Sequence, residues 1–462
     1  MTETIEENLE MKSNLKGFTI FWSGQLFSIL GSSIIQFVLA WWVTVQTESA
    51  LLLSLSIFIG FIPTVLLTPI AGVFVDRWNR KALIGSADFL QAAATVVLVF
   101  LFKYNKMTIT LLMVFLAIRG IFQAFHQPSI QALIPIMVPR KHLSRVNSIQ
   151  YFLSSIIYLI GPLVAALLYK FFPIHQILWL DGITFVIAFI PLIMIKIPTI
   201  KKTIVKNVEK ISFFTEFKEG FIFIKNKKGL LPMMISFAST NLFLIPLFTL
   251  INLYIYSNHG GGESELAFVL AFNQIGTIAG TTVFIFWKGF KKKINGVALG
   301  IIIGFLGYIM ISFTPSGLYW FMGIGFLIIG LALPAANISS QTIWQSIVPK
   351  EKLGRVMSVR IAIAQAVSPI GMILSGLIAE IVDIQYVFLT TAVIGLFLFV
   401  LFWIFSKMRT VEDGIVYEME EKSPKIEEDE INSDPLISLE IGKETKIDSS
   451  SNASAIPSLS SD

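Results

Sequence analysis

Cysteine is absent from this chain of 462 residues, and histidine occurs at only four positions, His126, His142, His175 and His259. Without a thiol there is no disulfide frame, no thiolate zinc site and no thiol nucleophile. The histidines lie too far apart in the sequence to form a metal-binding motif. We therefore expect neither a bound metal nor a cofactor.

Charged residues are also scarce, and long apolar runs take their place. Asp, Glu, Lys and Arg make up 14% of the chain, whereas a soluble domain carries about a quarter. Apolar residues make up 55% and include 40 Phe. The polar, acidic segment 1–16 has no cleavage pattern, so we do not expect a signal peptide. The composition predicts an integral membrane protein.

The apolar runs are long enough to cross a bilayer as helices, which takes about 20 residues each. Twelve spans are expected, near residues 18–45, 50–75, 82–102, 107–135, 146–170, 174–196, 229–256, 265–287, 295–314, 318–343, 356–380 and 386–406. A long polar stretch separates the sixth span from the seventh. The predicted fold class is an all-α integral membrane protein with twelve transmembrane helices.

The basic residues indicate how the helices are oriented, because Lys and Arg accumulate in cytoplasmic loops. If the amino terminus is inside, 25 basic residues fall in inner loops, against only Lys103, Lys106 and Lys170 in outer loops. We therefore expect both termini to be cytoplasmic. The basic clusters are short and lie between apolar runs, so we expect no nucleic-acid partner.

The tail differs in charge from the rest of the chain. From Val411 onward there are 14 acidic and 4 basic residues, a balance of −10, so the preceding 410 residues carry +15 of the total of +5. A tail rich in Ser, Glu and Lys is typical of disordered segments, although a regulatory docking tail is the alternative. The predicted domains are a cytoplasmic segment 1–17, a six-helix bundle 18–196, a cytoplasmic loop 197–228, a second bundle 229–408 and the acidic tail 409–462.

A short internal repeat relates the two bundles. The segment VPRKHLSRVNS at 138–148 recurs as VPKEKLGRVMS at 348–358, with Val, Pro, a base, Leu, Arg, Val and Ser in register. Each copy follows the fourth span of its half. Two six-helix halves joined by a long loop form the parallel-repeat plan of major facilitator transporters. The sequence therefore predicts two six-helix pseudo-repeats in the major facilitator fold.

The loop after the second span resembles the signature of that superfamily, G-x-x-x-D-R-x-G-R-K. Here it reads GVFVDRWNRK, with Asn79 in place of the second Gly, and Asn also tolerates turn conformations. In the superfamily this loop latches the two halves together, which implies that Asp76 faces the start of the eleventh helix near Arg355. The implied latch residues are Gly72, Asp76, Arg77, Arg80, Lys81 and Arg355. A generic basic loop is the alternative.

Further segments between residues 18 and 408 resemble the bacterial macrolide-efflux branch of the superfamily. They lie at 60–63, 119–139, 161–162, 353–356 and 368–371. The pair Gly161-Pro162 resembles the fifth-helix motif of antiporters, and Ser368-Pro369 lies at a similar place in the eleventh span. We expect both pairs to kink their helices, as prolines do in membrane spans. The resemblance implies a drug:proton antiporter of a bacterial inner membrane, functional as a monomer.

Ionisable residues inside the spans are candidates for the transport chemistry, because charges within a bilayer are costly. Arg119 lies near the middle of the fourth span, where the resemblance implies a role in proton coupling. Asp181 in the sixth span and Asp88 in the third are acids whose desolvation favours the neutral form. We expect Asp181 to bind the proton beside Arg119. Structural ion pairing or local capping is the alternative, and we favour it for Asp88.

Uncharged polar residues on the first and seventh spans are candidates for the substrate cavity. These residues are Gln25, Gln36, Asn241 and Asn252. A mostly apolar cavity with few polar groups suits bulky hydrophobic substrates. The Phe residues around them line this cavity or else face lipid.

These patterns together predict a secondary active transporter that exports small hydrophobic compounds, such as macrolide-like drugs, by proton antiport with alternating access. The proton gradient is the expected energy source, since the chain has no G-x-x-x-x-G-K-[ST] loop for ATP. A siderophore or lipid transporter of the same fold is an alternative. A multi-pass membrane enzyme acting on lipids is the alternative from another class, but the clustered acids or histidines it needs are lacking. We expect no enzyme.

Overall fold

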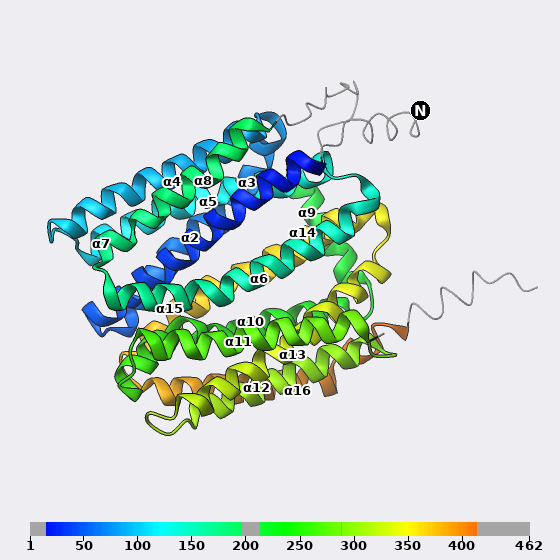
Figure 1. Cartoon of the computed structure of the whole chain (residues 1–462). Helices are drawn as coiled ribbons and strands as arrows, with labels where there is room; N and C mark the ends of the chain where they lie inside the picture. The colour runs from blue at the N-terminus through cyan, green and yellow to red at the C-terminus, as the bar shows by residue number, and fades with distance from the viewer. Residues whose placement is uncertain (1–14, 196–212, 288, 414–462) are drawn as a thin grey trace, which may run out of the picture. The chain divides into compact units, whose positions relative to one another are not determined.

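The computed structural model describes residues 15–195, 213–287 and 289–413, and the regular elements in these ranges are helices (Figure 1). The first half contains α2 (Leu15–Thr47), α3 (Ala50–Arg77), α4 (Arg80–Lys103), α5 (Ile109–Met137), α6 (Arg140–Phe171), α7 (Ile174–Ile177) and α8 (Trp179–Met194). After α9 (Phe213–Asn226), the second half contains α10 (Leu230–Leu253), η1 (Tyr254–Asn258), α11 (Glu263–Phe286), α12 (Lys293–Ser312), α13 (Tyr319–Ile347), α14 (Lys350–Ala366), α15 (Ser368–Ala379), α16 (Ile384–Phe405) and η2 (Lys407–Thr410). The predictions for the segment 1–14 and for the tail beyond 413 lie outside the described residues.

Twelve helical segments of the described chain are long and apolar enough to cross a membrane, which confirms the predicted number of spans. The sixth span consists of α7 and α8, the seventh of α10 and η1, and the eleventh of α14 and α15. A helix suits this environment because it satisfies its own backbone hydrogen bonds where no water is available.

Polar side chains at the ends of these helices satisfy the first backbone N–H groups, which have no partner within the helix. Ser49 accepts a hydrogen bond from the backbone N–H of Leu52 at the start of α3. Thr108 does the same for Leu111 at the start of α5, and Asp383 caps α16. The helix boundaries are therefore encoded by short polar residues between the apolar runs.

In α8 the distribution of exposed apolar and buried polar residues is the reverse of that on a surface helix of a soluble protein. Its outward stripe is apolar and each member is more than half exposed, namely Ile183, Val186, Ile190 and Ile193. Its acid, Asp181, is buried together with Ala188 and Leu192. A helix with apolar residues outside and a carboxylate inside is suited to lipid and not to water.

Helix packing repeats between the two halves. In the first half α2 packs against α6 and α8, α4 against α5 and α8, and α3 against α5. In the second half α10 packs against α15 and α16, α12 against α13 and α16, and α11 against α13. Numbered within each half, these are the same pairs of spans. The pairing confirms two six-helix pseudo-repeats.

The sequence repeat has the same backbone geometry in both halves. Pro139 precedes α6 with φ −56° and ψ 142°, and Pro349 precedes α14 with φ −55° and ψ 145°. The preceding Val138 and Val348 are both buried. Proline just before the first turn costs no hydrogen bond, because its missing N–H would have had no partner in the helix. The two copies therefore act as equivalent helix starts.

The two halves meet mainly along two helix pairs, α3 with α15 and α6 with α11. Figure 1 shows the second pair, and α10 adds further contacts with α2 and α3. We call the end of the bundles with the start of α2 and the end of α16 the terminal face, and the other end the opposite face. At the opposite face, the Glu380 carboxylate accepts hydrogen bonds from the Ser49 hydroxyl at 2.5 Å and the Leu51 N–H at 2.8 Å. Nearby, Trp41 and Tyr256 form an edge contact with ring centroids 5.8 Å apart. These contacts hold the halves together at the opposite face.

The fifth and eleventh spans differ in continuity. The eleventh span is interrupted for one residue, Val367, between α14 and α15 and just before Ser368 and Pro369, although Val367 keeps helical angles with φ −80° and ψ −28°. Proline lacks an N–H and clashes with the preceding turn, which accounts for the break. Its counterpart α6 runs on through Pro162 without a break. Gly161 lies against Ser33 of α2, where a side chain would collide, so close packing of α2 and α6 requires this glycine.

A helix that the sequence interpretation did not predict, α9, lies within the expected loop 197–228. Its Gly220 and Ile224 are buried, and a Cβ at Gly220 would lie 2.9 Å from the Arg355 carbonyl oxygen of α14. The i, i+4 spacing of these two residues is typical of one buried helix face. The segment therefore packs on the start of the eleventh span.

Candidate functional site

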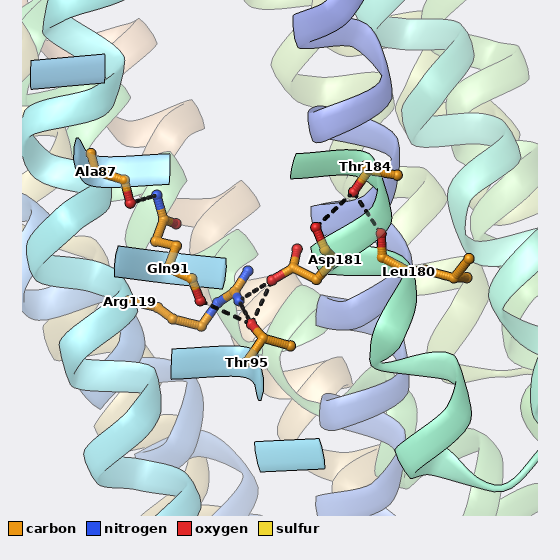
Figure 2. Close-up of polar contacts among 7 residues, drawn as sticks. All are labelled: Ala87, Gln91, Thr95, Arg119, Leu180, Asp181 and Thr184. Atoms are coloured by element: carbon orange, nitrogen blue, oxygen red, sulfur yellow. Dashed lines mark hydrogen bonds and ion pairs between the residues drawn. The ribbon is translucent and has the colours of Figure 1, made fainter. Parts of the chain in front are cut away.

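Two of the predicted proton-coupling residues meet inside the first bundle (Figure 2). The Nη1 atom of Arg119 on α5 lies 2.7 Å from Oδ2 of Asp181 on α8. The Thr95 hydroxyl on α4 donates to the same carboxylate oxygen at 2.5 Å and accepts a hydrogen bond from Arg119. Only 14% of the Arg119 side chain and 8% of the Asp181 side chain are exposed. The charges are therefore paired with each other, away from solvent.

Local helix geometry helps to place the Asp181 carboxylate. Asp181 lies in the first turn of α8, directly after the interruption between α7 and α8. The amino-terminal end of a helix carries partial positive charge, which stabilises an anion there. Thr184, one turn later, donates to the carbonyl oxygens of Leu180 and Asp181, as Figure 2 shows. The anion thus has three stabilising partners, namely a guanidinium, a hydroxyl and a helix end.

Asp88 does not join this pair but forms a second one. Its Oδ1 atom lies 2.9 Å from Nε2 of His126 on α5, at ion-pair distance but without the angles of a hydrogen bond. Its Oδ2 atom accepts a hydrogen bond of 3.4 Å from the Gln25 amide on α2. All three side chains are buried. Three helices therefore contribute to a second polar cluster within the same bundle.

The two clusters lie on the same pair of helices, one above the other along the helix axes. Asp88 and Thr95 are seven residues apart on α4, and Arg119 and His126 are seven apart on the antiparallel α5. Seven residues are about two helical turns, or roughly 10 Å along the axis. Gln91 on α4 and Gln123 on α5 lie midway between the two clusters. The facing sides of α4 and α5 thus form a polar column in an apolar bundle.

The sequence patterns indicate no role for His126 and Thr95, and they make Gln25 a candidate for the substrate cavity. Gln25 is fully buried against Asp88 and does not line an open surface. The sequence signal that could have identified this cluster is a spacing of seven residues between polar side chains, present on both α4 and α5, which are adjacent and antiparallel. That spacing becomes informative only once α4 and α5 are known to pair in this register.

The predicted latch is described only in part. The side chains of Asp76 and Arg77 lie outside the described residues, so their placement stays a prediction. Arg355 forms an ion pair with Glu219 of α9, with Nη1 and Oε2 2.6 Å apart. A Cβ at Gly72 would meet no atom within 4 Å. The described partner of Arg355 thus belongs to the connecting helix.

The remaining residues of the signature loop cap helices of the first bundle. Asn79, with φ −68°, accepts hydrogen bonds from the backbone N–H groups of Lys81 and Ala82 and caps α4. It is therefore a helix cap in an ordinary conformation and not a turn residue with positive φ. The Lys81 ammonium donates to the carbonyl oxygens of Ile193 and Ile195 at the end of α8, where a cation is favourable. The Nε of Arg80 lies 3.4 Å from the carbonyl oxygen at residue 75.

The other cavity candidates are more accessible than Gln25. Gln36 on α2 is exposed, and Asn241 and Asn252 on α10 are half-buried. The helix α10 packs against α2 and α3 of the first half, so both asparagines lie on a helix at the boundary between the halves. A direct contact among the three polar side chains stays a prediction.

The sequence of the chain matches the family model described as Major Facilitator Superfamily over residues 21–360 and 296–438. The chain belongs to the major facilitator superfamily. Among curated members of the superfamily, macrolide efflux protein A of Streptococcus pyogenes is 29% identical over 375 residues, which cover 81% of this chain and 92% of that protein. The staphyloferrin A transporter of Staphylococcus aureus is 25% identical over 378 residues, 80% of this chain and 91% of that protein.

Solved structures of major facilitator transporters share the fold at low identity. A variant of the nucleoside transporter NupG aligns with a TM-score of 0.67 and 15% identity, covering 83% of this chain and all of that one. A bacterial homologue of the iron transporter ferroportin, in an inward-facing state, aligns with a TM-score of 0.64 and 16% identity over 84% of this chain and 99% of that one. These likenesses confirm the fold. The chain is a multi-pass membrane protein of a transporter family.

Proposed function

We propose that this transporter exports macrolide-like hydrophobic compounds across the bacterial inner membrane in exchange for protons. The likeness to macrolide efflux protein A over most of both chains supports the substrate class. The buried ion pair of Arg119 and Asp181 is the observation that supports the proposal of proton-coupled export. The proposal places both termini in the cytoplasm and treats the monomer as the functional unit.

Proton coupling follows from the charge balance of this pair. Protonation of Asp181 neutralises the carboxylate and leaves the Arg119 guanidinium with the Thr95 hydroxyl as its remaining described partner. An unpaired charge in a dry interior is strongly unfavourable. The guanidinium then gains from any rearrangement that brings water or substrate to it. Proton loading from outside and drug binding from inside thereby favour different arrangements of the two halves.

A siderophore is the second candidate substrate, and one comparison favours it. The staphyloferrin A transporter matches nearly the whole membrane region at 25% identity. A siderophore carries several anionic groups, whereas a macrolide is bulky and largely apolar. Export assays with both compounds in the same cells separate the two candidates.

The first test is accumulation of a radiolabelled macrolide in drug-sensitive bacteria that express the protein. We expect lower accumulation than in control cells, and we expect a protonophore to abolish the difference. Asp181→Asn should lose gradient-driven export because it removes the proton-binding group and leaves Arg119 without its anion. Unchanged accumulation, with the protein present in the membrane, would contradict the macrolide assignment but leave the fold unaffected.

A double variant shows whether the pair acts in transport or only in stability. Breaking a buried ion pair from one side costs about 3–5 kcal/mol, and removing both charges costs less. Asp181→Asn combined with Arg119→Gln should therefore recover thermal stability relative to Asp181→Asn alone. If stability returns and coupled export does not, the pair acts in transport. If export returns with stability, the role is structural.

A further inference from the structure

Beside the Arg119–Asp181 pair, the first bundle contains a buried titratable group that this mechanism does not use. His126 is 7% exposed, and its Nε2 atom lies 2.9 Å from the Asp88 carboxylate. A histidine is the side chain whose ordinary titration falls between pH 5 and 8, the range over which a proton gradient acts. An arginine keeps its proton throughout that range.

The surroundings of His126 are consistent with a group that changes its charge. The Asp88 oxygen 2.9 Å from Nε2 stabilises an imidazolium, and the Gln25 amide holds the other carboxylate oxygen in place. The Nδ1 atom of the same ring is buried without a described hydrogen-bond partner. A buried polar atom without a partner calls for an explanation, and the arrival of a proton or a water during the cycle provides one.

The charged groups around this cluster are few. By sequence, the charged residues and histidines of the helices packed on α4 and α5 are Lys16 at the start of α2, Asp76 and Arg77 at the end of α3, Arg140, Lys141, His142, Arg145 and Lys170 towards the ends of α6, His175 on α7 and Asp181 on α8. On α4 and α5 themselves they are Arg80, Lys81, Asp88, Lys103, Arg119 and His126. Asp88 is therefore the described anion beside His126, and the Arg119–Asp181 pair is two helical turns away. Within the described residues no third His, Asp or Glu completes a metal site with them.

We propose that His126, paired with Asp88 and Gln25, is a second proton-binding site of the transport cycle, in register with the Arg119–Asp181 pair on the same two helices. The inference rests on the proposed proton-coupled export. The proton arriving at His126 binds the free ring nitrogen, so that the neutral ring becomes an imidazolium facing the Asp88 carboxylate. The reverse step returns the proton to water at the terminal face. Asp88 lies nearer to that face than Asp181 does.

The direct test follows the imidazole of His126 by nuclear magnetic resonance in the full-length protein reconstituted in lipid nanodiscs. The chain has four histidines, so His126→Gln assigns one signal by its disappearance. We expect that signal to change with pH between pH 5 and 8, the ordinary range of histidine, without any drug, and we expect added macrolide to alter this change. Asp88→Asn should lower the proton occupancy of His126, because it removes the facing anion. A signal with no titration in this range would overturn the proposal.

Transport in proteoliposomes provides the second readout. His126→Gln should reduce the rate of gradient-driven export on the order of a hundredfold, the lower range for a positioned proton-transfer group, and should flatten its pH profile. The matched control is His175→Gln, on α7 at the opposite face and outside the polar column, which should leave the profile unchanged. An unchanged profile in a folded His126→Gln protein would refute the inference.

These readouts separate the two proposals. If the unmodified protein exports no macrolide against a proton gradient, the proposed function fails whatever His126 does. If export is gradient-driven but both His126 readouts are negative, only the second site fails. Where His126→Gln does not fold, Gln25→Leu tests the same cluster, since it should change the His126 signal while the imidazole stays in place.

Discussion

The Glu380 carboxylate is a single residue that joins the two halves at the opposite face. Its bonds from the Ser49 hydroxyl and the Leu51 N–H hold the pKa of this exposed carboxyl below its ordinary value, with the Ser49 hydrogen bond as the main cause. Because the pKa of Glu380 is lower in the folded protein than in the unfolded chain, the contact contributes its full stabilising free energy above the ordinary Glu pKa of about 4.3. The stabilisation is then lost as the pH falls through the lowered pKa.

We expect the distance between the halves at this face to be constant from pH 7 down to the ordinary Glu pKa of about 4.3, and to increase as the pH falls further, through the lowered pKa of Glu380. Spin labels on Gln46→Cys and Val382→Cys, in a chain without native cysteine, report that distance by double electron–electron resonance. Glu380→Gln should remove the pH dependence. Glu263→Gln, on α11 and outside this contact, should retain it. A transition that persists in Glu380→Gln would assign the effect to another group.

Single residues also mark the limit of interpretation from sequence. Burial of Asp181, Arg119 and Asp88 could be predicted, because an ionisable residue within an apolar run has little alternative. The partner of each could not, since it depends on the rotation of α4 against α5. Gln25 illustrates this: its position on α2 was compatible with either a cavity or a bundle interior, and only packing decides.

At the scale of helices, the approach of α15 to α3 depends on one glycine. A Cβ at Gly376 would lie 2.6 Å from the Ser54 Cβ and 3.0 Å from the Ala50 carbonyl oxygen. Both neighbours belong to α3, and backbone atoms cannot move aside as a flexible side chain can. We expect Gly376→Ala to push the helices apart and weaken closure at the opposite face, which the same spin-label distance measures.

The matched control for this change is Gly354→Ala on α14, where a Cβ would meet no atom within 4 Å. That substitution should leave the distance unchanged and stabilise the helix by up to about 1 kcal/mol, the difference in helix propensity. Equal distances in both variants would show that the α3–α15 approach does not control closure.

Helix α9 shows what the hydropathy pattern cannot predict. The segment 213–226 is too short and too charged for a membrane span, so hydropathy predicts a loop there. It is helical because Gly220 and Ile224 bury one face against α14, a tertiary contact that provides most of the stability of a short helix. The twelve spans were predictable because bilayer thickness alone dictates their length.

At the scale of the whole molecule, the orientation in the membrane is a prediction from charge alone. Single cysteines introduced into the cysteine-free chain test it. Ser316→Cys lies between α12 and α13 at the opposite face, and Lys291→Cys lies between α11 and α12 at the terminal face. In intact cells we expect a membrane-impermeant maleimide to label position 316 and not 291 until the membrane is opened. The reverse pattern would invert the topology and the direction of transport.

The eleventh span makes different contacts on the two sides of Val367. The segment nearer the terminal face, α14, packs against α9. The segment nearer the opposite face, α15, packs against α3 and ends beside Glu380. Only Val367 separates these two segments, and its φ of −80° and ψ of −28° are helical. The span therefore joins the contact with α9 at the terminal face to the contact with α3 at the opposite face. Its counterpart α6 is one uninterrupted helix.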